Sequence, residues 1–167
     1  SPHNLVHGRQ GHLLAAFSFL KEEPVYRIPR YRVALVREGT HSSPVKTITS
    51  PQHAYEVLRD QLEDRDREVV VAIFLNTRNA AIGIHEVSVG TLNTSLLHPR
   101  ETYRAAILAG AAAIILGHCH PSGTPEQSRE DIAISVRLKE VGELIGIPLI
   151  DHIIVGDGQF VSLKERG

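Results

Sequence analysis

Two histidines at the end of a short apolar run constrain the fold of this chain more than any other feature. The run covers residues 111–116, and the histidines are His118 and His120. Short apolar runs are typical of buried strands, in which side chains two residues apart point to the same face. We therefore expect His118 and His120 to project together from the end of a strand, with Cys119 facing the opposite way as a small core residue.

A serine and an aspartate complete a pattern that reads H-x-H-P-x6-S-x2-D. Ser128 and Asp131 follow a loop rich in Pro, Gly and Ser and begin a helical pattern. Ser-x-x-Asp resembles a capping box, and an acid in the first turn suits the helix dipole. We expect the cap to fix the turn and the turn to direct Asp131 toward His118 and His120. Three protein ligands of the N, N and O type, with a fourth position left for water, are typical of a catalytic zinc site. The alternative is two polar residues at a strand end beside an ordinary helix cap.

Four sequence segments in this order resemble the JAMM motif of the JAB/MPN metalloprotease superfamily, and within it the bacterial RadC-like branch. They are Gly90-Thr91-Leu92-Asn93, His98-Pro99-Arg100-Glu101, the segment from His118 to Asp131, and Asp151-His152-Ile153-Ile154-Val155-Gly156. Two positions depart from the usual pattern of that branch: Cys119 stands where asparagine is usual, and Gln127 where proline is frequent. Neither departure removes a ligand.

The resemblance implies a zinc-dependent metallohydrolase with one Zn²⁺ per chain, held by His118, His120 and Asp131. It assigns the catalytic base to the strand upstream of the Gly-Thr segment, where Glu86 interrupts an apolar stretch. It also assigns to Ser128 the hydrogen bond to the tetrahedral oxyanion. The alternative for Glu86 is an edge-strand acid that faces water. Three further glutamates lie near the motif in sequence, and for these a solvated or dipole-favoured place at a helix start is the simpler interpretation: Glu101, Glu126 and Glu130.

The reaction implied by the resemblance is hydrolysis of a peptide or isopeptide bond in a peptide or protein substrate, including conjugates of ubiquitin-like proteins. The alternative is a non-enzymatic, metal-stabilised interaction module associated with DNA repair or mobile elements. A zinc nucleobase deaminase has a related fold outline, but its signature requires at least two cysteines. This chain has one, which excludes that class. Asp151 and His152 are expected mainly to tie the last hairpin to the sheet, although a role in orienting a metal ligand stays open.

The composition sets limits on location and partners. The net charge is -1 with 22% charged residues, and acids and bases alternate in the run from Glu63 to Glu68, which we interpret as a solvated helix end. No strong nucleic-acid binding is therefore expected. The longest apolar run, residues 105–116, is about half of the ~20 residues that span a membrane. One cysteine and no recognisable signal peptide favour a cytoplasmic location. The oligomeric state stays open.

Periodicity and turn residues predict an α/β (α+β) domain with a mixed β-sheet flanked by helices. We expect an N-terminal extension over residues 1–30, with a short helix at 13–20, and a RadC-like JAB/JAMM domain over residues 31–167. The predicted strands are 31–36, 69–75, 82–89, 112–118, 148–155 and 160–163. The predicted helices are 51–61, 99–108 and 128–144.

Overall fold

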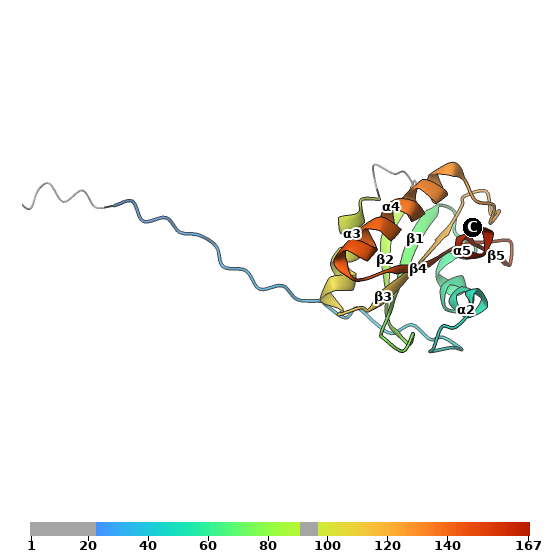
Figure 1. Ribbon diagram of the computed structural model, residues 1–167, viewed down its shortest axis with the longest axis horizontal. Helices are drawn as coiled ribbons and strands as arrows, with labels where there is room; N and C mark the ends of the chain where they lie inside the picture. The colour runs from blue at the N-terminus through green and yellow to red at the C-terminus, as the bar shows by residue number, and fades with distance from the viewer. Residues whose placement is uncertain (1–22, 91–96) are drawn as a thin grey trace, which may run out of the picture. The chain divides into compact units, whose positions relative to one another are not determined.

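The structure is a computed structural model that describes residues 23–90 and 97–167 (Figure 1). Contacts within the chain divide it into two units, Ser1–Arg32 and Val33–Gly167. The described part of the first unit, residues 23–32, contains no helix or strand. The second unit contains the helices and strands that carry the candidate site.

The second unit has a five-stranded sheet in the order β2-β1-β3-β4-β5. The strands are β1 (Glu68–Leu75), β2 (Ala81–Gly90), β3 (Ala113–Cys119), β4 (Leu149–Gly156) and β5 (Gln159–Ser162). The helices are α2 (Pro51–Leu62), α3 (Pro99–Leu108), α4 (Arg129–Ile145) and α5 (Leu163–Arg166). The β3–β4 pair is parallel and the other neighbouring pairs are antiparallel. This mixed sheet with helices confirms the predicted α+β class.

Helices cover both faces of the sheet (Figure 1). Helix α2 packs on one face, where Leu58 joins Val71 of β1 in an apolar core. Helices α3 and α4 pack on the other face, where Leu138 joins Ala72 of β1 in a second core. Successive residues of a strand point to opposite faces, so a continuous apolar strand such as β1 contributes to both cores.

The pairing of β1 with β3 fixes the direction of the histidine pair. Val70 lies opposite His118, and Val69 lies opposite Cys119. Because Val70 belongs to the core on the α3/α4 face, His118 also points to that face. Cys119 is buried in the core under α2, on the opposite side, in agreement with the expected alternation.

Local signals explain where the helices begin. Ser50 caps α2 by accepting a hydrogen bond from the backbone N–H of His53, with proline at the first helical position. Helix α3 likewise starts at Pro99 after an N-terminal cap from His98. These caps follow from short sequence patterns, which is why the predicted starts agree with the structure.

The strand predicted at residues 31–36 is absent, and this prediction was wrong. The side chains of Tyr31 and Val33 are exposed, and no strand is assigned over these residues. Strands are stabilised by cross-strand neighbours, and the described residues supply none for this segment. The helix predicted at 13–20 and the segment Thr91-Leu92-Asn93 lie outside the described residues. None of the helices in the described ranges has the length and apolar character needed to cross a membrane.

Candidate metal centre

Three of the predicted site residues converge at the end of β3 and the start of α4. The Nε2 atoms of His118 and His120 are 2.9 Å apart. Asp131 places Oδ1 at 2.9 Å from His118 Nε2 and Oδ2 at 3.1 Å from His120 Nε2. The side chains of His118 and Asp131 are buried, and that of His120 is 14% exposed. Two imidazole nitrogens and a carboxylate therefore share one small, partly accessible space.

The first turn of α4 holds Asp131 in this position. Ser128 Oγ accepts a hydrogen bond from the Asp131 N–H at 3.2 Å, and Asp131 Oδ2 accepts one from the Ser128 N–H at 2.6 Å. The two contacts form the capping box that the sequence predicts. The same carboxylate thus caps the helix and faces both histidines.

The electrostatics of the cluster favour a negative charge on Asp131. Burial acts to raise its pKa, but hydrogen bonds from His118 and His120 outweigh burial and hold the pKa of this carboxyl well below its usual range. The hydrogen bond to Asp131 in turn raises the pKa of His120 above its ordinary value. A buried carboxylate of this kind is compensated by a positive partner, a proton on the imidazoles or a metal ion.

The outer nitrogen of each histidine also has a partner. His120 Nδ1 lies 3.0 Å from the carbonyl oxygen of Thr124, and His118 Nδ1 lies 2.6 Å from His152 Nε2 on β4. His152 in turn contacts the Ser135 hydroxyl of α4 through Nδ1. Burial lowers the pKa of His152 well below its ordinary value, which favours the neutral imidazole.

Asp151 and His152 have different contacts: Asp151 binds neighbouring parts of the fold, and His152 contacts a histidine of the cluster. Asp151 accepts hydrogen bonds from the Ser162 hydroxyl at 2.6 Å and from the Lys164 N–H at 3.1 Å. It therefore ties β5 and α5 to β4, which is a contact within the last hairpin, whereas a tie between the hairpin and the rest of the sheet was expected. His152 points to the other face of β4 and contacts His118, which the sequence did not decide.

Glu68 joins the site although no function was predicted for it. It is the first residue of β1 and shares a face with Val70, two residues along, which lies opposite His118. Ligand atoms of Glu68, His118 and His120 all lie within 4.8 Å of one another, a spacing that can hold a metal ion. The run of charges before β1 made a solvated position the simpler interpretation. The alternation of side chains along a strand could have placed Glu68, because Glu68 and Val70 are two residues apart and point to the same face of β1.

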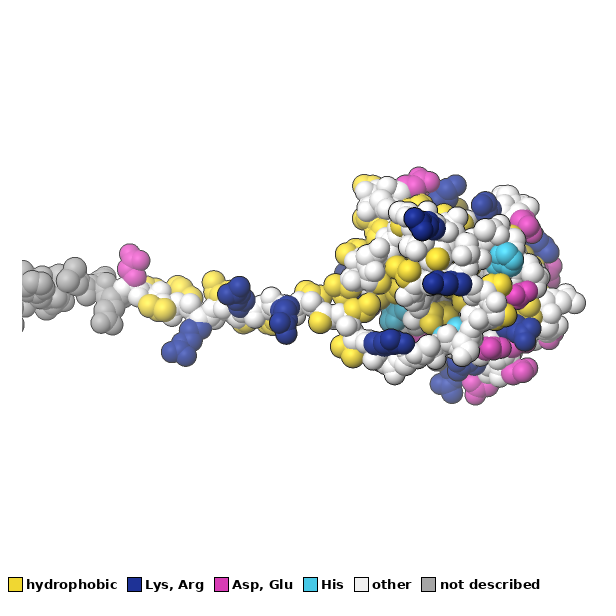
Figure 2. Space-filling model, turned by 90° about the horizontal axis from the view of Figure 1, so that it is seen from below, with side chains coloured by type: hydrophobic (Ala, Val, Ile, Leu, Met, Phe, Trp, Pro, Cys, Tyr) yellow, Lys and Arg dark blue, Asp and Glu magenta, His cyan; other side chains and the backbone are white. Residues whose placement is uncertain are grey.

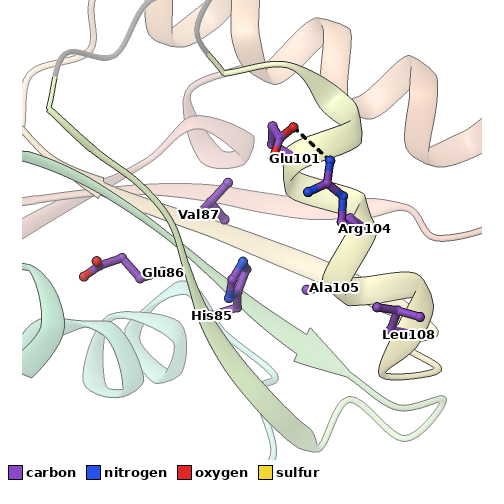
Figure 3. Close-up of a pocket in the computed structure, with 7 residues that line it drawn as sticks. All are labelled: His85, Glu86, Val87, Glu101, Arg104, Ala105 and Leu108. Carbon is purple, nitrogen blue, oxygen red and sulfur yellow. Dashed lines mark hydrogen bonds and ion pairs between the residues drawn. The ribbon is translucent and has the colours of Figure 1, made fainter. Parts of the chain in front are cut away.

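Glu86 is not brought to the histidines. It lies opposite Val71, whose side chain belongs to the core under α2, on the face away from His118. Its carboxylate is about half exposed and lies 4.0 Å from the Arg65 guanidinium. Figure 3 shows Glu86 on the other side of β2 from His85.

The other glutamates near the motif are not grouped with His118 and His120. Glu101 accepts a hydrogen bond from Arg104 at 3.1 Å, and both residues line a cleft of about 310 Å³ between β2 and α3 (Figure 3). Glu126 and Glu130 are exposed around the start of α4. Among the described residues, Glu68 is the glutamate that the structure groups with His118 and His120.

Comparison with known proteins identifies a family for this chain. The family model described as "RadC-like JAB domain" matches residues 48–167. A UPF0758 protein of Clostridium beijerinckii is 51% identical over 120 residues, which cover 72% of this chain and 52% of the relative. A UPF0758 protein of Clostridium acetobutylicum is 52% identical with the same coverage.

A relative of lower identity has the same printed name. A UPF0758 protein of Methanosarcina mazei is 41% identical over 124 residues, which cover 74% of this chain and 54% of the relative. The chain thus spans about half the length of these relatives. The match over residues 48–167 includes the whole sheet, the histidine pair and the capped aspartate. The chain therefore belongs to the RadC-like JAB domain family.

Proposed function

We propose that this domain is a zinc-dependent hydrolase that cleaves a peptide or isopeptide bond, with His118, His120 and Asp131 as the metal ligands. The observation that carries the proposal is the convergence of two imidazole Nε2 atoms and one carboxylate within 3.1 Å of one another. A cluster of this type, three protein ligands without a cysteine, is typical of catalytic zinc sites, whereas structural sites use four ligands.

The spacing of these donor atoms supports zinc. Nitrogen and oxygen ligands at zinc lie at about 2.0–2.1 Å from the ion, so two tetrahedral ligands are about 3.3 Å apart. The separations in the structure are 2.9, 2.9 and 3.1 Å. A widening of a few tenths of an ångström is all that the three side chains need. The outer nitrogens, held by Thr124 and His152, leave both Nε2 atoms directed inward.

Glu68 is the side chain best placed to act as the general base. A zinc ion in this position supplies acidity, because it lowers the pKa of a bound water to about 7. The Glu68 carboxylate lies on the same face as His118, and its ligand atom is within 4.8 Å of both histidine nitrogens. It can receive the proton of the attacking water and deliver it to the leaving amine. Glu86 cannot reach this space without crossing the sheet.

Ser128 is proposed to stabilise the oxyanion. Its oxygen accepts the Asp131 N–H, and a hydroxyl that accepts still has a proton to donate. The capping box fixes its position next to Asp131. A donor directed at developing negative charge lowers the barrier of acyl transfer. Replacement of Ser128 by alanine should cost less activity than loss of the base, because water or a backbone donor partly replaces the hydroxyl.

The substrate class comes from the family resemblance, and the names of the relatives specify no reaction. We propose a peptide or protein substrate, including conjugates of ubiquitin-like proteins. A screen that offers matched peptide-linked and isopeptide-linked substrates to the zinc-loaded protein identifies the bond that is cleaved.

The decisive experiment compares Glu68→Gln with Glu86→Gln on any substrate found in that screen. Glutamine keeps the size of the side chain but cannot accept the proton. Turnover per bound zinc should fall about 10²–10⁴-fold in Glu68→Gln, the usual contribution of a positioned acid–base group. It should change little in Glu86→Gln, since that carboxylate is exposed on the other face. The reverse pattern would return the base to Glu86. Metal binding without turnover of any peptide or isopeptide substrate would favour the non-enzymatic module.

A further inference from the structure

We propose that His152 is a positioning residue that fixes the tautomer of His118 and connects this ligand to the helix that carries Asp131. The inference rests on the proposed metal site and goes beyond it, because it assigns a role to two side chains, His152 and Ser135, that supply no ligand atom. The connection runs through buried hydrogen bonds from β3 across β4 to α4.

The connection has three links. His118 Nδ1 lies 2.6 Å from His152 Nε2, and the two ring centroids are 4.7 Å apart. His152 Nδ1 contacts the Ser135 hydroxyl. The Ser135 hydroxyl donates to the Asp131 carbonyl oxygen at 2.8 Å. The connection therefore begins at one proposed ligand and ends on the backbone of another.

Metal binding by His118 would determine which atom donates and which accepts in each of these three hydrogen bonds. If His118 Nε2 gives its lone pair to a metal ion, the neutral ring carries its proton on Nδ1. His152 Nε2 must then accept that proton, so His152 carries its own proton on Nδ1. That proton is donated to Ser135 Oγ, whose hydroxyl proton is already directed at the Asp131 carbonyl. Each of the three hydrogen bonds then has one donor and one acceptor, with a single proton between the two atoms.

Water cannot take the place of either histidine as a hydrogen-bond partner, because both side chains are buried. His118 and His152 are 0% and 1% exposed, so solvent does not replace a lost partner. An apolar side chain at position 152 would fill the same volume but leave the His118 Nδ1–H buried without an acceptor, which is costly. Without a metal ion, His118 Nε2 faces Asp131 Oδ1 at 2.9 Å, and a proton on Nε2 would be donated to that oxygen. His152 therefore supplies the acceptor that the Nδ1–H of His118 needs when Nε2 is the metal ligand.

Nitrogen NMR of the zinc-loaded wild-type chain, labelled with ¹⁵N-histidine, tests the proton positions directly. We expect His118 to be protonated on Nδ1 with Nε2 bound to zinc, and His152 to be protonated on Nδ1 with an unprotonated Nε2. His120, whose Nδ1 faces the Thr124 carbonyl, serves as the internal reference with Nδ1–H and a zinc-bound Nε2. A zinc-loaded protein in which His152 carries its proton on Nε2 overturns the inference.

Two substitutions at position 152 separate positioning from packing. His152→Leu removes the acceptor and keeps an apolar volume, and it should weaken zinc affinity about 10–100-fold, the usual effect of losing the partner of a metal-bound histidine. His152→Gln places an amide oxygen near the position of Nε2 and should recover part of that loss. Affinity is measured by competition with a zinc chelator, at a pH where the variants show unchanged circular dichroism.

Ser135→Ala provides a variant that is safe for folding, since alanine favours a helix. It removes the two links made by the Ser135 hydroxyl but keeps the contact between His118 and His152, so it should weaken zinc affinity less than His152→Leu. A folded His152→Leu protein with wild-type zinc affinity contradicts the inference. Wild-type protein that binds no zinc contradicts the inference together with the metal site. Zinc binding with the expected tautomers but without hydrolysis contradicts the proposed reaction alone.

Discussion

At the scale of single residues, the carboxylate of Asp131 accepts hydrogen bonds from two directions. One oxygen faces His118, and the other faces both His120 and the Ser128 backbone N–H. The helix start and the candidate metal cluster consequently depend on the same side chain. A short local pattern is enough to specify this geometry, because the turn that caps the helix also directs the Asp131 carboxylate at the two histidines.

Cys119 lies between the two histidines in sequence but should not contribute to the metal site. It is buried in the core under α2, and burial raises the pKa of its thiol, which disfavours the thiolate that a metal requires. Cys119→Ser should keep full zinc content. It should lower the free energy of unfolding by about 1–3 kcal/mol, because a hydroxyl replaces a thiol in an apolar site. Metal analysis and urea denaturation check both outcomes, and a folded variant without zinc would contradict the account.

The sequence was sufficient to predict that the side chains of His118, His120 and Asp131 converge, because local structure determines their directions. A strand period and a helix cap, both within one short stretch, determine how these three side chains point. Glu68 comes from a distant strand, and its approach depends on the register of β1 against β3. Register is set by tertiary pairing, which a single sequence does not reveal. His152 depends in the same way on the parallel pairing of β4 with β3.

At the scale of elements, the end of β4 supports the loop that follows the histidines. A side chain at Gly156 would place its Cβ 2.0 Å from the carbonyl oxygen of Gly123 and 3.0 Å from the carbonyl carbon of Thr124. Both atoms belong to the backbone, so the loop and the strand can approach only if position 156 has no side chain. The Thr124 carbonyl also contacts His120 Nδ1, which links this packing to the proposed metal site.

Gly156→Ala should therefore affect both stability and metal affinity. We expect a loss of about 1–3 kcal/mol in the free energy of unfolding, typical of overpacking, and weaker zinc binding as the loop moves away from His120. The matched control is Gly39→Ala, where an added Cβ meets nothing within 4 Å and stability should stay within about 0.5 kcal/mol. Thermal denaturation and chelator competition measure the two effects. Equal behaviour of the two variants would show that the loop tolerates the displacement.

Elements whose ends are marked by local sequence signals agree with their predictions, whereas the strand predicted at residues 31–36, which has no neighbouring strand among the described residues, does not. Helix α3 begins and ends where the sequence placed it, at Pro99 and Leu108, because a cap and a nearby glycine mark its ends. The segment 31–36 is largely apolar, as a strand can be, but has no assigned strand structure. An apolar segment does not form a strand when cross-strand neighbours are missing.

At the scale of the whole molecule, charge is balanced. The chain has 18 Lys and Arg against 19 Asp and Glu. On the face in Figure 2, acidic and basic side chains are interspersed over the Val33–Gly167 unit. Duplex DNA should bind weakly, with an affinity that falls steeply with salt. Fluorescence anisotropy at low and moderate salt checks this expectation, and tight binding that survives moderate salt would favour the repair-associated module.

Metal content tests the central claim most directly, because every step of the proposed chemistry requires the cluster of His118, His120 and Asp131 to hold an ion. The measurement is elemental analysis by mass spectrometry of protein purified without chelator. Wild-type protein and the control His53→Ala, altered on helix α2, should each contain one zinc per chain. The double variant His118→Ala/His120→Ala should contain none while keeping its secondary structure. Stoichiometric zinc in that double variant would contradict the account.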